Sequence, residues 1–220
     1  KLEFSKTEHL TSEGYFTYLK EFKGGHSLNA VAGYSYFEKN GENFNAENYD
    51  FGVEGLKYWD LGAGSYLTDG KAAMGSGKNI TERLFALYAR ANYSYNDKYM
   101  VSATIRHEGS SKFAAENRWG NFWALSGGWR VSAEEFMKEF DWVSDLKVRF
   151  GYGVTGNNDF DASYMANTLS RDQYWMLPSG SWAYVYGPSS NVNPYLGWEE
   201  KKEWNIGVDY SFFGNRMYGK

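Results

Sequence analysis

The sequence contains no cysteine, three prolines and three histidines, and it lacks any long apolar run. The missing cysteines exclude disulfides and thiolate metal sites. No apolar stretch approaches the roughly 20 residues that a membrane-spanning helix requires. His9, His26 and His107 lie on separate segments, so we expect no histidine metal site. A disulfide-stapled domain and a helical membrane protein are both excluded.

Clusters of basic residues are also missing. The chain has 23 Lys and Arg residues against 27 Asp and Glu residues, a net charge of −4. Because nucleic-acid binding depends on clustered cations that neutralise phosphates, we expect no nucleic-acid partner. The first residues show no charged leader followed by an apolar region, so we expect either a processed chain or a fragment.

Aromatic residues are abundant, at 20% of the 220 residues, whereas the mean hydropathy is −0.63. This combination is too rich in ordering side chains for a disordered chain and too polar for a bundle of membrane helices. Six segments alternate apolar and polar residues with a period of two, which predicts β-strands. They span residues 27–36, 85–95, 99–106, 122–131, 146–155 and 203–212. Residues 15–22 predict a seventh strand, whose orientation stays open because both faces carry aromatics.

The connections between these strands differ in length. Residues 23–26, 96–98 and 214–215 form short links, whereas residues 38–82, 108–120 and 156–201 form long ones. Residues 132–145 form a compact link, in which Ser132 to Glu135 resembles a capping box and predicts one or two helical turns. Short turns at one end and long loops at the other are typical of a transmembrane β-barrel.

Aromatic residues are concentrated near both ends of the apolar strand faces, and smaller or aliphatic residues occupy the middle. Such a distribution matches the aromatic girdles of an outer-membrane barrel and favours a barrel over a soluble, lectin-like sandwich. With the 96–98 link taken as periplasmic, that end carries Tyr93, Tyr95, Tyr99, Trp129, Tyr210 and Phe212. The opposite end carries Tyr34, Tyr36, Phe85, Trp123, Tyr152 and Trp204.

The polar strand faces would line the lumen of such a barrel. They carry five positive and two negative charges: Arg90, Arg106, Arg130, Lys147 and Arg149 against Glu203 and Asp209. These residues either pair with one another or face an interior domain. A plug domain with an acidic surface is our hypothesis for the second case.

Signals for catalysis are weak. Gly77-Lys78 lacks the Ser or Thr of a phosphate-binding loop, and Glu134-Glu135 and Glu199-Glu200 fit structural roles better than acid–base chemistry. We therefore expect no enzyme activity, no catalytic residue, no metal and no cofactor. Aromatic and polar residues in the long loops suit sugars or peptides, although packing within the loops explains them equally well. The candidates are Arg118, Trp119, Tyr174, Trp175, Trp182, Tyr184 and Tyr186.

Three blocks of sequence resemble the barrel of SusC/RagA-like TonB-dependent transporters. The first spans residues 92–137, with Gly109 to Phe113, Arg118-Trp119-Gly120 and Gly128-Trp129-Arg130 as its characteristic groups. The others span residues 143–158 and 193–217. Together they cover about half of the chain.

The resemblance implies an all-β fold, an antiparallel transmembrane barrel segment with long extracellular loops. About seven or eight strands of a larger, 22-stranded barrel would lie within residues 1–220, and residues 216–220 would begin a further strand. The plug domain would lie outside this chain. The resemblance further implies a bacterial outer-membrane importer of glycan or peptide fragments, with a SusD-like surface lipoprotein, TonB and outer-membrane lipid as partners. A soluble or surface carbohydrate-binding β-sheet module is the alternative.

Overall fold

The computed structural model describes residues 1–53, 55, 59–79, 81–160, 169–188 and 193–220. Its architecture is all-β and antiparallel, with little helix. In the part of the chain just defined, no helix has the length and apolar character needed to cross a membrane. The short helical turns that these residues contain lie in connections: η2 (Leu61–Ala63), α1 (Ser65–Thr68), η3 (Val131–Ala133) and η4 (Glu135–Met137).

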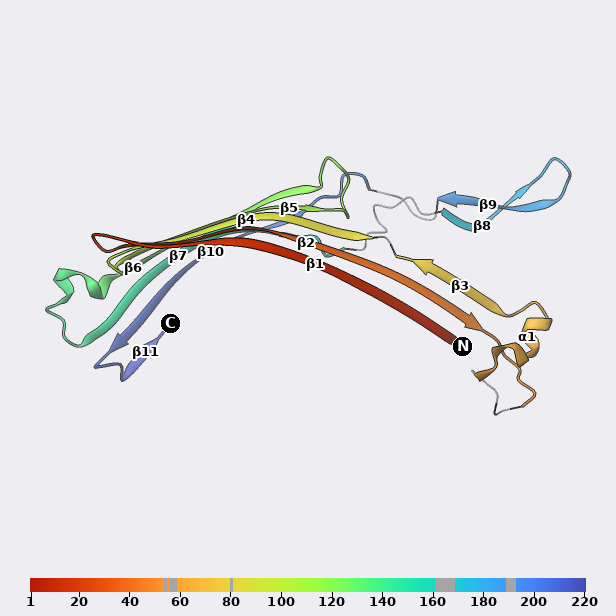
Figure 1. The fold of residues 1–220 in the computed structure, drawn as a ribbon, viewed down its shortest axis with the longest axis horizontal. Helices are drawn as coiled ribbons and strands as arrows, with labels where there is room; N and C mark the ends of the chain where they lie inside the picture. Colours follow the sequence, from red (N-terminus) through yellow and green to blue (C-terminus); the bar gives the residue numbers. More distant parts are fainter. Residues whose placement is uncertain (54, 56–58, 80, 161–168, 189–192) are drawn as a thin grey trace. The chain divides into compact units, whose positions relative to one another are not determined.

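The main sheet has nine strands, of which eight follow one another in the order β1-β2-β4-β5-β6-β7-β10-β11, while β3 pairs with β2 (Figure 1). A separate two-stranded sheet joins β8 and β9. The strands are β1 (Leu2–Phe22), β2 (His26–Glu47), β3 (Ala73–Lys78), β4 (Glu82–Tyr95), β5 (Tyr99–Ser110), β6 (Trp119–Arg130), β7 (Val143–Asn157), β8 (Leu169–Met176), β9 (Trp182–Pro188), β10 (Glu199–Phe212) and β11 (Met217–Gly219).

The chain divides into two compact units. One comprises residues 1–11 and 37–83, and the other comprises residues 12–36 and 84–220. The first unit contains β3 paired with residues 42–47 of β2, together with α1. The second unit contains β4 to β7, β10 and β11, and all of the polar and aromatic sites described below.

All six strands predicted from alternation are confirmed, and the seventh is also a strand. The eight-strand path agrees with the seven or eight strands expected. The structure also resolves the orientation of the seventh strand, β1. Phe16 and Tyr18 share an apolar groove with Ala30 and Ala32 of β2, whereas Tyr15 faces Gly33 on the opposite, polar side.

The long link predicted over residues 38–82 is partly wrong. Strand β2 continues to Glu47, and β3 pairs with it antiparallel from Glu42↔Lys78 to Glu47↔Ala73. Alternation is weak in this stretch because the strand carries Asn and Glu on both faces, so the period of two that marks a half-buried strand is lost. β1 and β2 have 21 and 22 residues, about twice the 9–11 that a tilted strand needs to cross a bilayer.

Tight turns at the short links use left-handed backbone conformations. Asn96 and Asp97 have φ of 49° and 54°, in the left-handed region that asparagine and aspartate tolerate in tight turns. The backbone N–H of Asn96 donates to the Gly25 carbonyl at 2.7 Å, so the β1–β2 and β4–β5 turns are neighbours. These links therefore meet at one edge of the sheet, as predicted.

The compact link contains the expected helical turns, η3 and η4, but the predicted capping box is wrong. The Ser132 hydroxyl donates to Asp145 Oδ1 at 2.8 Å rather than capping a turn. Glu134 precedes η4 and makes no cap with its side chain. Asp145 draws Ser132 away because β7 begins at Val143, earlier than the alternation indicated.

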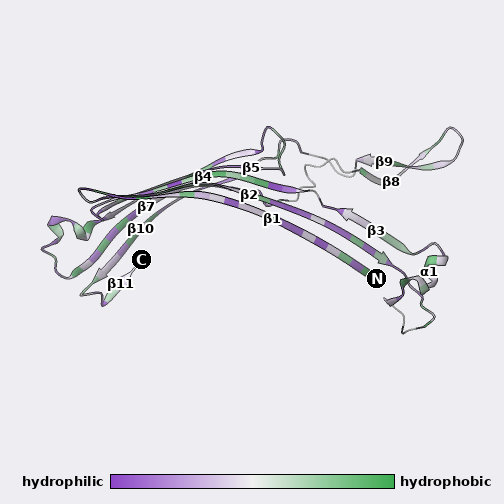
Figure 2. Ribbon diagram, in the orientation of Figure 1, coloured by the Kyte–Doolittle hydropathy of each residue, from purple (hydrophilic) through white to green (hydrophobic). Residues whose placement is uncertain are grey.

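The two faces of the main sheet differ in chemistry. Cross-strand register places Ala91, Ala103 and Leu125 side by side on the apolar face, and Asn92, Ser102 and Ser126 on the polar face. Apolar-face side chains in the middle of the strands are about half exposed, with values of 51% for Leu87, 53% for Ile105 and 65% for Ile206. Figure 2 shows hydrophobic and hydrophilic residues interspersed along the strands. The apolar face is therefore a surface without a covering layer among the described residues.

Candidate functional site

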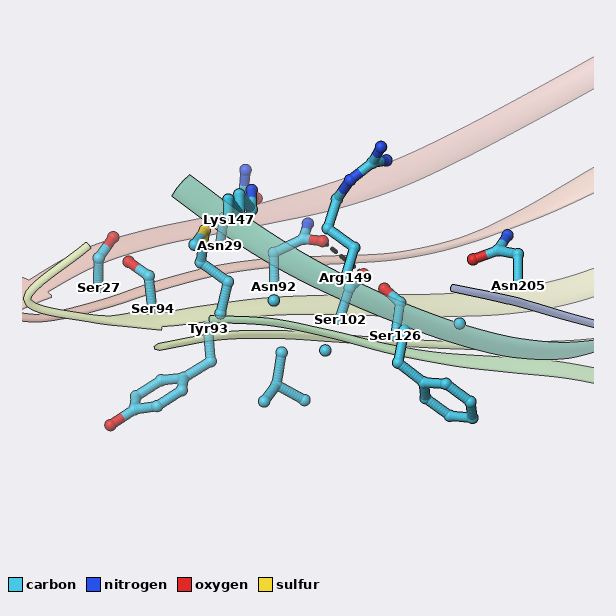
Figure 3. Close-up of a pocket in the computed structure, with 16 residues that line it drawn as sticks. Ser27, Asn29, Asn92, Tyr93, Ser94, Ser102, Ser126, Lys147, Arg149 and Asn205 are labelled. Carbon is cyan, nitrogen blue, oxygen red and sulfur yellow. Dashed lines mark hydrogen bonds between the residues drawn. The ribbon is translucent and has the colours of Figure 1, made fainter. Parts of the chain in front are cut away.

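A polar hollow of about 440 Å³ lies on the polar face of the main sheet, in the half nearer the short turns (Figure 3). Side chains of six strands meet there because odd or even positions of neighbouring strands share one face. Serine and asparagine predominate, and Tyr93 points to the opposite face in Figure 3. The polar lining consists of Ser27, Asn29, Asn92, Ser94, Ser102, Ser126, Lys147, Arg149 and Asn205.

Hydrogen bonds order part of this hollow. The Ser102 hydroxyl donates to Asn92 Oδ1 at 2.7 Å, and Arg90 Nε donates to the same oxygen at 3.3 Å. Arg149 Nη2 donates to Asp209 Oδ1 at 2.8 Å. Gly128 keeps room for the lysine stem, because a Cβ there would lie 3.1 Å from Lys147 Cε. Small residues on the strands thus leave space over charged and amide groups.

The structure adds acidic partners to the polar face that the sequence count missed. Arg106 binds Glu108 through two bonds of 2.8 Å and also donates to Ser35 Oγ at 3.3 Å. Arg130 lies 3.5 Å from Asp145. Glu108 and Asp145 were outside the predicted strands, whereas β5 reaches Ser110 and β7 starts at Val143. The excess of positive charge on this face is therefore smaller than five against two.

The seven charged residues predicted for the polar strand faces all lie at positions that face the polar side of the sheet. Glu203 pairs with Lys201 at 2.9 Å, two residues along β10, rather than with one of the five predicted cations. Lys147 lies directly across from Asp209 in the register, but the Asp209 carboxylate bonds to Arg149 instead. That these residues line a lumen stays a prediction.

A second group, the loop-base cluster, consists of Phe113, Phe122, Phe160 and Trp198. Phe113 is the centre of the cluster and is only 2% exposed. Its ring centroid lies 5.0 Å from that of Phe160 and 5.1 Å from that of Trp198, and Phe122 lies 5.0 Å from Trp198. These rings come from the β5–β6 connection, β6 and both ends of the β7–β10 connection. The cluster therefore fastens the bases of two long loops to the sheet.

Polar bonds reinforce the loop-base cluster. Lys112 Nζ donates to the Phe160 carbonyl at 2.9 Å, and Trp198 Nε1 donates to the Arg118 carbonyl at 3.0 Å. A Cβ added to Gly120 or Gly156 would collide with the Phe122 ring. Several residues of the characteristic sequence groups therefore have a packing role.

The structure places Arg118 and Trp119 differently from the predicted loop surface. Trp119 is the first residue of β6, not a loop residue, and its ring stacks on His107 with centroids 4.7 Å apart and planes 3° from parallel. Arg118 contributes its carbonyl to the loop-base cluster. Because β6 starts earlier than the alternation suggested, Trp119 lies across from Gly109 in the register. Their contact with substrate stays a prediction.

The remaining aromatic candidates lie together on the β8–β9 hairpin. Tyr174 and Tyr184 pair directly across the strands, and their hydroxyls are 2.6 Å apart. Tyr174, Trp182, Tyr184 and Tyr186 share one face, whereas Trp175 lies on the other. All five are more than half exposed. Sequence reasoning placed these residues in a loop, and it missed the two strands because aromatics occupy both faces.

A cluster at the short-turn edge was not predicted. Glu134 accepts hydrogen bonds from the Tyr99 hydroxyl at 2.6 Å, Trp129 Nε1 at 3.1 Å and Lys98 Nζ at 3.3 Å. These donors, with Tyr99 foremost, hold the pKa of the Glu134 carboxyl below its usual range. Two residues of the predicted aromatic girdle are thus oriented by one carboxylate. Sequence spacing does not reveal this contact, because 35 residues separate Tyr99 from Glu134.

No group of three or more His, Asp or Glu residues is arranged to hold a metal ion in the described ranges. The sites described above are a polar hollow, a loop-base cluster, an aromatic hairpin and an edge cluster.

Comparisons with known proteins agree with this architecture. Residues 3–220 match the family described as TonB dependent receptor-like, beta-barrel. The chain is 34% identical over 216 residues to TonB-dependent receptor P39 of Formosa agariphila, covering 94% of this chain and 19% of that protein. It is 36% identical over 138 residues to TonB-dependent receptor SusC of Bacteroides thetaiotaomicron, covering 62% of this chain and 14% of that protein.

Among solved structures, the RagAB peptide importer in its closed-closed state matches with a TM-score of 0.78 and 24% identity. The match covers 98% of this chain and 22% of that one, and at this identity it concerns the fold. The chain spans about a fifth of the length of the proteins it matches.

Proposed function

This chain belongs to the family of TonB-dependent receptor-like β-barrels, and from that premise we propose that it is a section of an outer-membrane importer. The observation that carries the proposal is the two-faced antiparallel sheet, apolar on one side and polar on the other, with tight turns at one edge. In a barrel wall, the apolar side meets lipid and the polar side meets water or an interior domain. The same sheet therefore explains both the low mean hydropathy and the exposed apolar face.

Lipid contact is supported by the apolar face itself. Leu87, Ile105, Leu125 and Ile206 are between 48% and 65% exposed, and no described element covers them. A soluble monomer rarely leaves so large a contiguous apolar patch exposed. Outer-membrane lipid accounts for it, and a bacterial outer membrane is the location we propose. The alternative, a soluble carbohydrate-binding module, leaves this face unexplained.

The importer would take up oligosaccharides or peptides with a SusD-like lipoprotein as its surface partner. Sequence similarity to SusC and the fold shared with the RagAB peptide importer support such a partner. TonB would supply energy through the part of the protein outside this chain, where a plug domain would also lie. The exposed aromatics of the β8–β9 hairpin suit contact with either cargo or partner, because Tyr and Trp present large amphipathic surfaces.

Uptake by cells that carry the full-length protein tests the proposal. We expect labelled oligosaccharides or labelled peptides to accumulate in these cells, and accumulation to stop when the gene is deleted. Collapse of the proton gradient should stop uptake equally, because TonB draws on that gradient. Comparing the two cargo classes separates the glycan reading from the peptide reading. A protein that fractionates as soluble without detergent would contradict the membrane assignment.

A further inference from the structure

The polar hollow has an unusual balance of groups. Sixteen residues line it, and among them are two cations but no aspartate or glutamate. Its hydroxyl and amide groups supply donors at several angles, since serine, asparagine, lysine and arginine all carry N–H or O–H groups. A ligand that only accepts hydrogen bonds and carries negative charge matches this lining.

Lys147 is the cation that lacks a counter-charge. Its neighbours Asp209 and Asp145 are occupied, the first by Arg149 at 2.8 Å and the second by Arg130 at 3.5 Å. Within the described ranges, no carboxylate lies at ion-pair distance from the Lys147 ammonium. A cation in a cleft with fixed dipoles attracts anions more strongly than a lysine in open solvent.

Arg149 has spare capacity beside it. One of its five N–H donors binds Asp209, and in Figure 3 the side chain rises from the sheet on the same side as the Asn92 side chain. Gly128 and Gly151 leave room for the neighbouring side chains. A Cβ on Gly128 would lie 3.1 Å from Lys147 Cε, and a Cβ on Gly151 would lie 3.0 Å from Asn205 Oδ1. The absence of a side chain at these two strand positions therefore keeps part of the hollow open.

We infer that this hollow binds a carboxylate group, with Lys147 as its charge partner and Arg149 and the serine hydroxyls as hydrogen-bond donors. Charge-assisted bonds of this kind are about twice as strong as neutral ones. The carboxylate comes either from an acidic side chain in the remainder of the same protein or from a cargo molecule. The inference rests on the proposed function only in treating the polar face as the inside of a barrel.

The test uses the full-length protein in its membrane, with Ser126→Cys as the single thiol. Iodoacetate carries a carboxylate and iodoacetamide is its neutral counterpart, so the ratio of their alkylation rates reports attraction of a carboxylate to the hollow. Lys147→Gln removes the charge, and Lys147→Arg retains it. Lys201→Gln is the matched control, because Lys201 lies on the same face but is paired with Glu203 at 2.9 Å and lies outside the hollow.

If cargo supplies the carboxylate, the hollow is accessible, and Lys147→Gln lowers the iodoacetate-to-iodoacetamide ratio by roughly 10-fold, the lower range for electrostatic focusing in a charged cleft. Lys147→Arg and Lys201→Gln leave the ratio unchanged. If the protein's own acidic residue fills the hollow, both reagents react slowly until Lys147→Gln releases it.

If the thiol reacts readily in the parent, a rate ratio that is the same with and without the Lys147 charge overturns the inference. If the thiol is protected in the parent, a thiol that stays protected in Lys147→Gln overturns it. Uptake of labelled cargo by the protein without the Ser126→Cys substitution is measured separately. Absence of uptake by that protein concerns the proposed function, whereas the rate ratio concerns only the carboxylate site.

Discussion

Substitution of Ala103 by arginine tests the assignment of the apolar face most directly. Ala103 lies between Ala91 and Leu125 in the register of β4, β5 and β6. It is four residues from Tyr99 at the short-turn end of β5. At about 3.3 Å per residue and a tilt of about 40°, that places it roughly 10 Å above the girdle, near the middle of a band about 25 Å tall.

An arginine at this depth should destabilise the full-length barrel by roughly 2–4 kcal/mol. This corresponds to a fall of about 30- to 700-fold in the ratio of folded to unfolded protein, since about 1.4 kcal/mol is a factor of ten. The measurement is equilibrium unfolding of the protein in lipid vesicles, followed by tryptophan fluorescence. Alanine is small, so lost packing contributes little to the difference.

Thr104→Arg is the matched control for Ala103→Arg. Thr104 is the next residue along β5 and faces the polar side across from Arg90. An arginine there meets a like charge in Arg90, which costs up to about 1 kcal/mol, but no lipid, so it should still cost less than one at Ala103. Equal losses at the two positions would refute the assignment of lipid to the apolar face.

Three further perturbations have definite expected results. Phe113→Ala removes the centre of the loop-base cluster and should destabilise the folded protein by about 3–5 kcal/mol, with earlier protease cleavage in the long loops as the readout. Gly156→Ala should also loosen the loops, because its Cβ would collide with the Phe122 ring. Glu134→Gln should remove a pH dependence of stability. Because the folded protein lowers the pKa of Glu134, the carboxylate stabilises the fold at neutral pH, and this stabilisation is lost as pH falls through the folded pKa. Fluorescence of Trp129, which donates to Glu134, reports the loss.

Each of these expectations has an outcome that contradicts it. Unchanged loop cleavage in Phe113→Ala would mean that the rings do not hold the loop bases. Normal protease resistance in Gly156→Ala would show that the Phe122 ring can move aside. Identical acid titrations of the parent and Glu134→Gln would remove Glu134 from its role at the edge.

Much of the sheet was predictable from segments such as residues 89–95 and 146–152, where apolar residues alternate with polar residues or glycine. Side chains on a strand point to opposite faces in turn, so the alternation determines both the element and its two environments. The short links were equally predictable, because Asn96-Asp97 and Gly24-Gly25 suit left-handed turn positions. Aromatics or polar residues on both faces concealed the outer part of β2 and the β8–β9 hairpin.

The sequence by itself determined the fold class, the strand faces and the family resemblance, because these depend on a local period and on short groups of residues. Tertiary structure decided which side chains meet. Pairing of β5 with β6 set Trp119 on His107, and folding of the long connections placed Phe113 against the rings of Phe160 and Trp198. The compact link brought Glu134 to Tyr99 and Trp129. Residues far apart in the chain make these contacts. Strand register and the path of the loops specify them, and an alternation with a period of two encodes neither.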